Sequence, residues 1–159
     1  MTALFPTIES RYSQWASVLL RLIVGYGFMA HGYAKLVRGS ENFAHILGAL
    51  GVPFPLLFSW VTILVELVGG AAFLLGAFVS LVSIPSVVVL LVAIVTVHLP
   101  NGFSSIKLQS VDAMGAHFGQ PGYETDLLYI ACIGALVLCG AGPLSLDKHF
   151  AGRLGARRP

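Results

Sequence analysis

Residues 56–99 read L-L-F-S-W-V-T-I-L-V-E-L-V-G-G-A-A-F-L-L-G-A-F-V-S-L-V-S-I-P-S-V-V-V-L-L-V-A-I-V-T-V-H-L, and Glu66 is the only acidic or basic side chain among them apart from His98. One membrane-spanning helix needs roughly 20 apolar residues, so this block has about the length of two. We expect a tight turn at about residues 76–80 to divide it, with Pro85 tolerated in the first turns of the second helix. The block therefore predicts two consecutive membrane spans, at about residues 56–78 and 81–99.

Two further apolar segments flank this block, at about residues 15–36 and 124–141. The composition is typical of a membrane protein, because 57% of the residues are hydrophobic and only 10% are charged. Soluble domains carry about 25% charged residues. We therefore predict an all-α polytopic membrane protein, a four-transmembrane-helix bundle that forms a single domain over residues 1–159. The lipid bilayer is an expected partner, whereas nucleic acid is excluded by a net charge of only +2 without a basic stripe.

The two sides of the predicted bundle differ in their lysine and arginine residues. The side of the termini and the tight turn holds Arg11, Lys148, Arg153, Arg157 and Arg158. The opposite side carries the two long links, one between the first and second spans and one between the third and fourth spans. It holds Lys35, Arg38 and Lys107. Cytoplasmic loops are enriched in these residues. We therefore expect a multi-pass protein of the bacterial cytoplasmic (inner) membrane, with both termini in the cytoplasm.

Several ionisable side chains fall inside the spans, where hydrocarbon penalises each charge by at least a few kcal/mol. In the first span, Arg21, His31 and Lys35 lie within about 100° of one another around a helix, so we expect this face to line the bundle. In the second span, two glycines follow Glu66, and small residues let another helix approach closely. The simplest arrangement is a buried ion pair between Arg21 and Glu66, which can also be purely structural.

A second group of polar residues gathers at the ends of the spans, on the side of the two long links. It consists of His31, Lys35, His98, Asn101, Glu124 and Asp126. We expect these residues to form the mouth of a site between spans one, three and four. Asn101, Glu124 and Asp126 lie at its rim. The candidate catalytic residues are His31, Lys35, Glu66 and His98, because imidazole, amine and carboxylate groups donate and accept protons.

Five stretches of the sequence, in order, resemble the DoxX family of small four-helix membrane proteins, which is related to the DoxD subunit of thiosulfate:quinone oxidoreductase. They are L-L-R-L-I-V-G-Y-G-F-M-A-H-G-Y-A-K (19–35), V-E-L-V-G-G-A-A-F-L-L-G (65–76), V-H-L-P-N-G-F (97–103), G-Y-E-T-D-L-L-Y-I (122–130) and G-P-L-S-L-D (142–147). The resemblance implies a four-helix bundle and redox work at the membrane with quinones. It places recurrent polar positions at Arg21, His31, Lys35, Glu66, His98, Asn101 and Glu124.

The favoured function is a quinone-linked membrane oxidoreductase subunit or redox-associated component. A quinone needs hydrogen-bond donors at its two carbonyl oxygens and a route for protons, and the candidate residues supply both. Two alternatives remain: a non-catalytic assembly or binding subunit, and a conduit for a small solute or for protons. Electrons must come from the substrate or from a redox partner protein, since no flavin, nucleotide or iron–sulfur motif is found. Association of the chain into a homo-oligomer is also considered.

The sequence does not determine the cofactor or the residues that bind it; a quinone is the candidate, and no metal site is predicted. Haem ligation by His31 and His98 is disfavoured, because histidines near a membrane interface more often bond to loops. Cys132 and Cys139 are seven residues apart, which separates them by roughly 10 Å on a helix. A disulfide needs Cα atoms within about 7 Å, so these two cysteines are expected to remain thiols.

Overall fold

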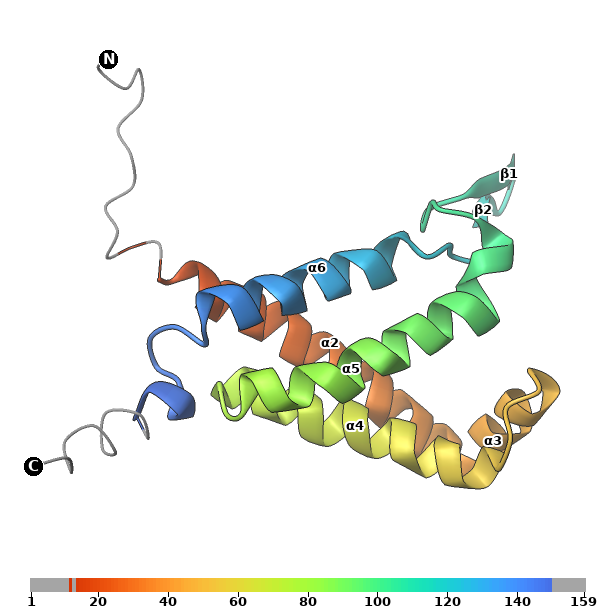
Figure 1. Ribbon diagram of the computed structural model, residues 1–159. Helices are drawn as coiled ribbons and strands as arrows, with labels where there is room; N and C mark the ends of the chain where they lie inside the picture. Colours follow the sequence, from red (N-terminus) through yellow and green to blue (C-terminus); the bar gives the residue numbers. More distant parts are fainter. Residues whose placement is uncertain (1–11, 13, 150–159) are drawn as a thin grey trace, which may run out of the picture.

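The computed structural model describes residues 12 and 14–149, and most of these are helical (Figure 1). The elements are α2 (Ala16–Arg38), α3 (Ser40–Ala49), α4 (Pro55–Leu75), α5 (Val79–Ala93), a π-helical turn (Ile94–His98), a 3-10 turn (Leu99–Asn101), β1 (Leu108–Asp112), β2 (Gly115–Phe118) and α6 (Glu124–Cys139). The prediction of a mainly helical protein is confirmed. The four long helices α2, α4, α5 and α6 coincide with the four apolar segments of the sequence.

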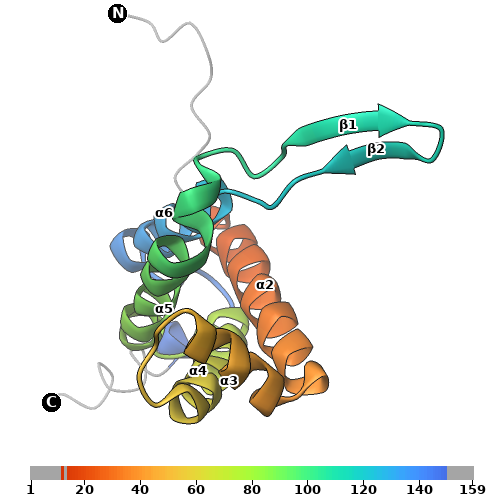
Figure 2. The same ribbon diagram turned by 90° about the vertical axis from the view of Figure 1, so that its right-hand side faces the viewer.

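Each long helix runs opposite to the one before it, so that the four form a bundle (Figure 1). Helix α4 packs against α2 and α5, and α6 packs against α5 and α2 (Figure 2). Helix α3 and the β-hairpin lie at one end of the bundle, here called the hairpin end. The turn between α4 and α5 and residues 140–149 lie at the other, the turn end (Figure 1).

The predicted tight turn occupies residues 76–78. Gly76 and Phe78 adopt the left-handed conformation there, with φ of 62° and 51°. The carboxylate of Asp147 accepts hydrogen bonds from the backbone N–H groups of Phe78 (2.6 Å) and Val79 (3.0 Å). Phe78 directly precedes α5 and Val79 is its first residue, so neither N–H group has a partner within the helix. Asp147 therefore caps α5 and fastens the C-terminal segment to the turn.

Glycines set the closest helix crossing, between α2 and α4. A Cβ added to Gly25 would lie 2.7 Å from the backbone oxygen of Gly70, and one added to Gly70 would lie 2.8 Å from the oxygen of Gly25. Real Cβ atoms essentially never approach other atoms that closely. A Cβ on Gly32 would similarly lie 2.9 Å from the Cβ of Glu66. These contacts fix the antiparallel register of the two helices.

The apolar core is concentrated toward the turn end. It consists of Val24, Phe28, Phe73, Val79, Ile133 and Leu136. The Phe28 ring packs at 6.1 Å from Phe73 and 5.8 Å from Tyr129, between ring centroids. In contrast, no residue of α5 after Ser86 is buried, nor is any residue of the π-helical turn. The helices are therefore packed most tightly at the turn end.

Two elements in the long links were not predicted. Gly39, with φ of 94°, ends α2, and α3 then packs two buried residues, Ala44 and Leu47, against the rest of the protein. The hydroxyl of Ser59 on α4 donates a hydrogen bond to the backbone oxygen of Ser40 at 2.7 Å, which holds the start of α3 in place. The second link forms the antiparallel hairpin of β1 and β2.

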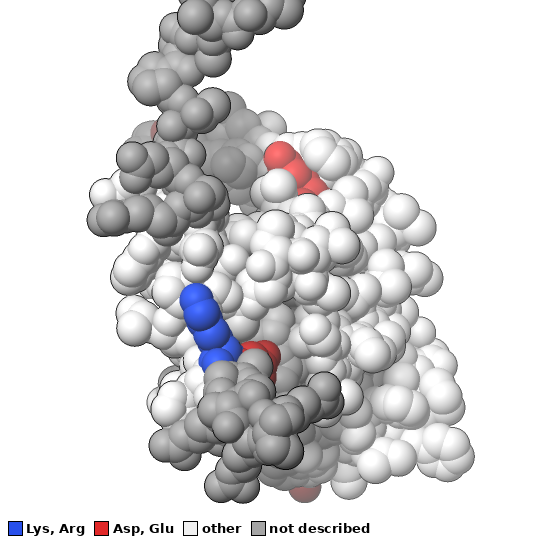
Figure 3. Space-filling view, turned by 60° about the vertical axis from the view of Figure 1, so that its left-hand side comes forward, with Lys and Arg blue, Asp and Glu red and all other residues white. Residues whose placement is uncertain are grey.

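The outer surface of the bundle is largely apolar. Large hydrophobic side chains are exposed on all four long helices, among them Leu22, Leu64, Leu91 and Leu138. Charged side chains are sparse on the face drawn in Figure 3. Two segments, Pro55–Leu75 and Val79–Asn101, are long and apolar enough to cross a membrane. Contiguous apolar surface of this kind is suited to contact with lipid rather than water.

Candidate functional site

Lys35 and Glu66 form an ion pair between α2 and α4. The Lys35 Nζ lies 2.6 Å from Oε1 and 2.7 Å from Oε2 of Glu66. The Glu66 side chain is 7% exposed and that of Lys35 is 23% exposed. The same Nζ lies 5.2 Å from the centroid of the Phe43 ring, at cation–π distance. Sequence reasoning did not select Phe43, because nothing in the first link indicated a helix α3 that packs against α4 beside Lys35.

The predicted ion pair between Arg21 and Glu66 is wrong. The register places Gly32 opposite Glu66 and Gly25 opposite Gly70, so Arg21 lies near the end of α4 beside Gly76. Gly76 is ten residues from Glu66, which is about 15 Å along a helix. Lys35 is one turn beyond Gly32, and helical side chains lean toward the N-terminus. Lys35 therefore reaches Glu66, and Arg21 does not.

Arg21 instead holds the C-terminal segment at the turn end. Its Nη2 donates hydrogen bonds to the backbone oxygens of Pro143 (2.9 Å) and Leu144 (3.5 Å). The residue is only 2% exposed, and its Nε is buried without a hydrogen-bond partner among the described residues. Arg21 and Asp147 thus fasten the same segment, residues 143–147, to the bundle from two sides.

His98 and Asp126 form a second acid–base pair, between the π-helical turn that follows α5 and the start of α6. The His98 Nδ1 lies 2.5 Å from Oδ2 of Asp126. Asp126 is in the first turn of α6, where the helix dipole favours a negative charge. His98 ends the π-helical turn, and such turns are frequent at functional sites. The Asp126 side chain is 9% exposed and that of His98 is 25% exposed, so the imidazole reaches the surface while its carboxylate partner is shielded.

His31 does not face the interior as predicted. It is exposed, whereas its neighbour Gly32 is buried. On a helical wheel His31 falls about 80° from Arg21, at the edge of the polar face, and this edge is not covered by another helix. His31 nevertheless lies close enough to Glu66 for an electrostatic interaction. It therefore belongs to the surroundings of the Lys35–Glu66 pair.

Asn101 and Glu124 organise the second link. The Asn101 side chain donates to the backbone oxygen of Val97 at 3.2 Å, within its own helical turn. The Glu124 carboxylate accepts a hydrogen bond from the backbone N–H of Ser105 at 2.9 Å. The predicted single mouth between spans one, three and four is therefore divided into two pairs. One joins α2 to α4, and the other joins α5 to α6, both toward the hairpin end.

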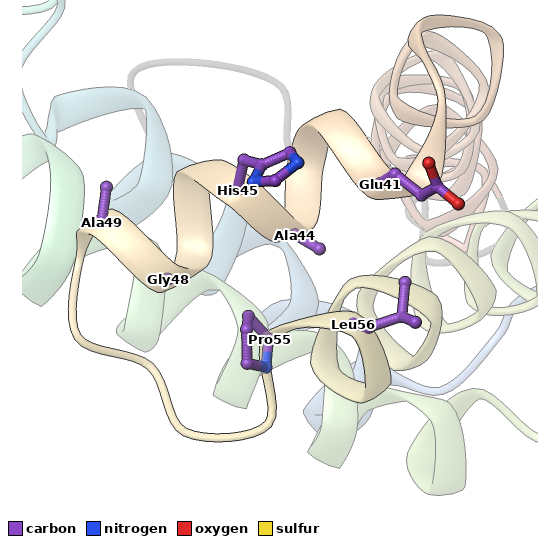
Figure 4. A pocket seen from close by; sticks show the side chains of 7 residues that line it. All are labelled: Glu41, Ala44, His45, Gly48, Ala49, Pro55 and Leu56. Atoms are coloured by element: carbon purple, nitrogen blue, oxygen red, sulfur yellow. The ribbon is translucent and has the colours of Figure 1, made fainter.

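Two hollows in the described part of the protein lie outside these pairs. One, of about 510 Å³, is between α3 and the start of α4, lined by small and apolar residues with Glu41 and His45 at its edge (Figure 4). The other, of about 480 Å³, lies at the turn end beside Ser17, Ser145 and Lys148. Neither hollow includes a residue that the sequence placed in the site.

The two pairs have different chemical capacities. In the Lys35–Glu66 pair, both carboxylate oxygens are engaged by the ammonium, so the pair is closed on itself. In the other pair, Asp126 engages only the Nδ1 of His98, and the Nε2 has no hydrogen bond within the described residues. A carboxylate on one ring nitrogen fixes the imidazole tautomer and orientation, which leaves the other nitrogen to exchange protons. His98 is therefore the best-placed group for acid–base chemistry.

Comparison with known proteins gives a family. A model of the DoxX family matches residues 16–99, which is more than half of the 159 residues of the chain. The matched range includes Lys35, Glu66 and His98 and ends before Asp126. Neither the curated proteins nor the solved structures contain a match to this chain. The resemblance found in the sequence is confirmed, and the chain belongs to the DoxX family of membrane proteins.

Proposed function

We propose that this protein crosses the bacterial cytoplasmic membrane four times, with both termini in the cytoplasm, and binds the headgroup of a quinone. The four antiparallel long helices and their exposed apolar side chains support four crossings. The orientation rests on the excess of lysine and arginine toward the termini. Under this arrangement the two acid–base pairs lie in the outer half of the membrane.

The observation that carries the proposal is the His98–Asp126 pair. Its imidazole is partly exposed beside α5, whose outer surface is apolar, and its Nε2 is available. A quinone headgroup can approach this nitrogen while its isoprenoid tail stays in lipid. With Asp126 accepting from Nδ1, a neutral His98 accepts a proton from a quinol hydroxyl at Nε2, and a protonated His98 donates to a quinone oxygen.

Reduction of a quinone to a quinol consumes two electrons and two protons. In this proposal a redox partner protein supplies the electrons, because the chain has no motif for a flavin, nucleotide or iron–sulfur cluster. His98 donates the two protons one after the other from Nε2, and water reprotonates it between the two steps because its side chain is 25% exposed. In this proposal the Lys35–Glu66 pair stabilises α2 and α4, on which α5 and α6 pack, in place of the catalytic role that the sequence favoured for Lys35 and Glu66.

A binding titration tests the proposal, with a matched control provided by the chain itself. His117 on the hairpin also pairs with an aspartate, at 2.9 Å from Asp112, but its side chain is 52% exposed. We expect His98→Gln to raise the Kd for decylubiquinone about tenfold, which is about 1.4 kcal/mol and the size of one hydrogen bond. His117→Gln should leave the Kd unchanged.

The titration is made by calorimetry on detergent-solubilised protein, with circular dichroism to confirm that both variants are folded. Equal Kd values for the parent, His98→Gln and His117→Gln would remove the basis for a quinone site at His98. A parent protein that binds no quinone at all would favour the alternative of a non-catalytic assembly subunit.

A further inference from the structure

The β-hairpin has two chemically different faces. Residues paired across the strands share a face, and successive pairs alternate between faces. The register therefore gives one apolar face: Leu108, Val111, Ala116 and Phe118. The opposite face is polar: Ser110, Asp112, Gly115 and His117. An irregularity between Leu108 and Ser110 inserts one extra residue in β1, and this bulge is what brings Leu108 and Val111 to the same face.

The apolar face is uncovered in the protein itself. Every residue of both strands is exposed. The apolar surface continues beyond the strands, since Met114 in the turn is 90% exposed and Ile106 at the base is 77% exposed. A two-stranded hairpin alone is at best marginally stable in water, and it gains stability when its hydrophobic face packs on another surface. The apolar face therefore requires a partner.

The position of the hairpin indicates which surface is within reach. Short links join its two ends to the helices: residues 102–107 follow Asn101, the last residue of a membrane-capable segment, and residues 119–123 precede Glu124, the first residue of α6. Viewed along the bundle, the hairpin projects sideways beyond the helices, with its two strands side by side (Figure 2). The hairpin thus starts where the helices end and extends across the bundle axis, parallel to the plane of a membrane that the bundle crosses.

We propose that the apolar face of this hairpin lies in the lipid surface of the membrane, at the boundary between headgroups and acyl chains. This inference rests on the four crossings of the proposed function. Amphipathic elements bind there with the apolar face buried about 5–10 Å and the polar face in water. The hairpin meets this requirement, because its apolar face has no charged side chain while the Asp112–His117 pair occupies the polar face.

A second copy of the chain is a less suitable partner for this face. A stable protein interface takes about 20–30 residues from each side. The apolar face offers four strand residues, with Met114 and Ile106 as extensions. Lipid requires no complementary surface of that size, and the helices at this end of the bundle also expose apolar side chains, among them Val95 and Leu128.

Site-directed spin labelling tests the inference on the whole protein in nanodiscs of phosphatidylcholine and phosphatidylglycerol. In a background with both cysteines changed to alanine, single labels are placed at Val111→Cys and at Ser110→Cys. These neighbours lie on opposite faces. We expect the label at Val111 to collide with oxygen and to be protected from a water-soluble nickel complex, and the label at Ser110 to show the reverse.

A third label, at Leu91→Cys on the outside of α5, reports on the membrane crossing itself. If Leu91 is in lipid while Val111 and Ser110 are equally accessible to the nickel complex, the hairpin inference is wrong and the proposed topology stands. If Leu91 is also in water, the proposed topology is wrong. Spin–spin broadening at Val111 that disappears on dilution with unlabelled protein would overturn the inference in favour of a second copy.

Discussion

Replacing Lys35 by methionine should destabilise the bundle by about 2–3 kcal/mol. The substitution keeps the length of the side chain but leaves Glu66, whose side chain is 7% exposed, without its ammonium partner. Removing one member of a buried ion pair costs about 3–5 kcal/mol. We expect about 2–3 kcal/mol here, below that range, because the Lys35 side chain is 23% exposed and water screens part of the interaction.

A double-mutant cycle with Glu66→Gln measures this interaction directly. Unfolding is followed by circular dichroism during titration of detergent micelles with sodium dodecyl sulfate. Lys35→Met combined with Glu66→Gln should cost less than the sum of the single changes, since the double variant contains no unpaired charge. Arg21→Met combined with Glu66→Gln should be additive, because these residues are about 15 Å apart along the helices. The reasoning would be refuted if Lys35→Met and Glu66→Gln each changed the free energy of unfolding by less than about 0.5 kcal/mol, the scale of an ordinary surface change.

Three further predictions concern other parts of the molecule. Gly70→Ala should destabilise by about 1–3 kcal/mol in the same titration, since its Cβ would lie 2.8 Å from the backbone oxygen of Gly25. Gly134→Ala, in the interior of α6 with nothing within 4 Å of the new atom, should not destabilise, because alanine favours a helix more than glycine does. Asp147→Ala should remove the cap of α5 and cost about 0.5–2 kcal/mol. The hydrogen bond from the His117 side chain, with further backbone bonds, lowers the pKa of Asp112 below 3.8. The carboxylate therefore stabilises the hairpin above pH 3.8 and loses this effect as the pH falls through the lowered pKa, so acidification should broaden hairpin amide signals in the parent but not in Asp112→Asn.

The positions of the long helices could be predicted because hydropathy alone carries the information. The predicted segment 124–141 corresponds to Glu124–Cys139, and the predicted turn at 76–80 corresponds to residues 76–78. The correct partner of Glu66 could not be predicted in the same way. It depends on the register of α2 against α4, which is set by contacts between glycines far apart in the sequence. Lys35 and Arg21 are both on the same face of α2, so helical periodicity does not distinguish them.

The pairing of the candidate site residues could not be predicted from the sequence. His98 and Asp126 were both placed at the link side of the bundle, and the structure joins them directly at 2.5 Å. The hairpin was missed because the bulge interrupts the alternation between Leu108 and Val111. The residues D-A-M-G at 112–115 were the available signal for a turn between two strands, and Gly115 has a φ of 121° in the structure.

Photoaffinity labelling with an azidoquinone tests the central claim most directly. Purified protein in lipid nanodiscs is irradiated with the quinone, digested, and mapped by mass spectrometry. A quinone headgroup at His98 should label residues 94–101 and 123–130, and excess decylubiquinone or the His98→Gln substitution should reduce that labelling. Labelling confined to the hollow between α3 and α4 (Figure 4), or labelling that decylubiquinone does not compete, would contradict a quinone site at the His98–Asp126 pair.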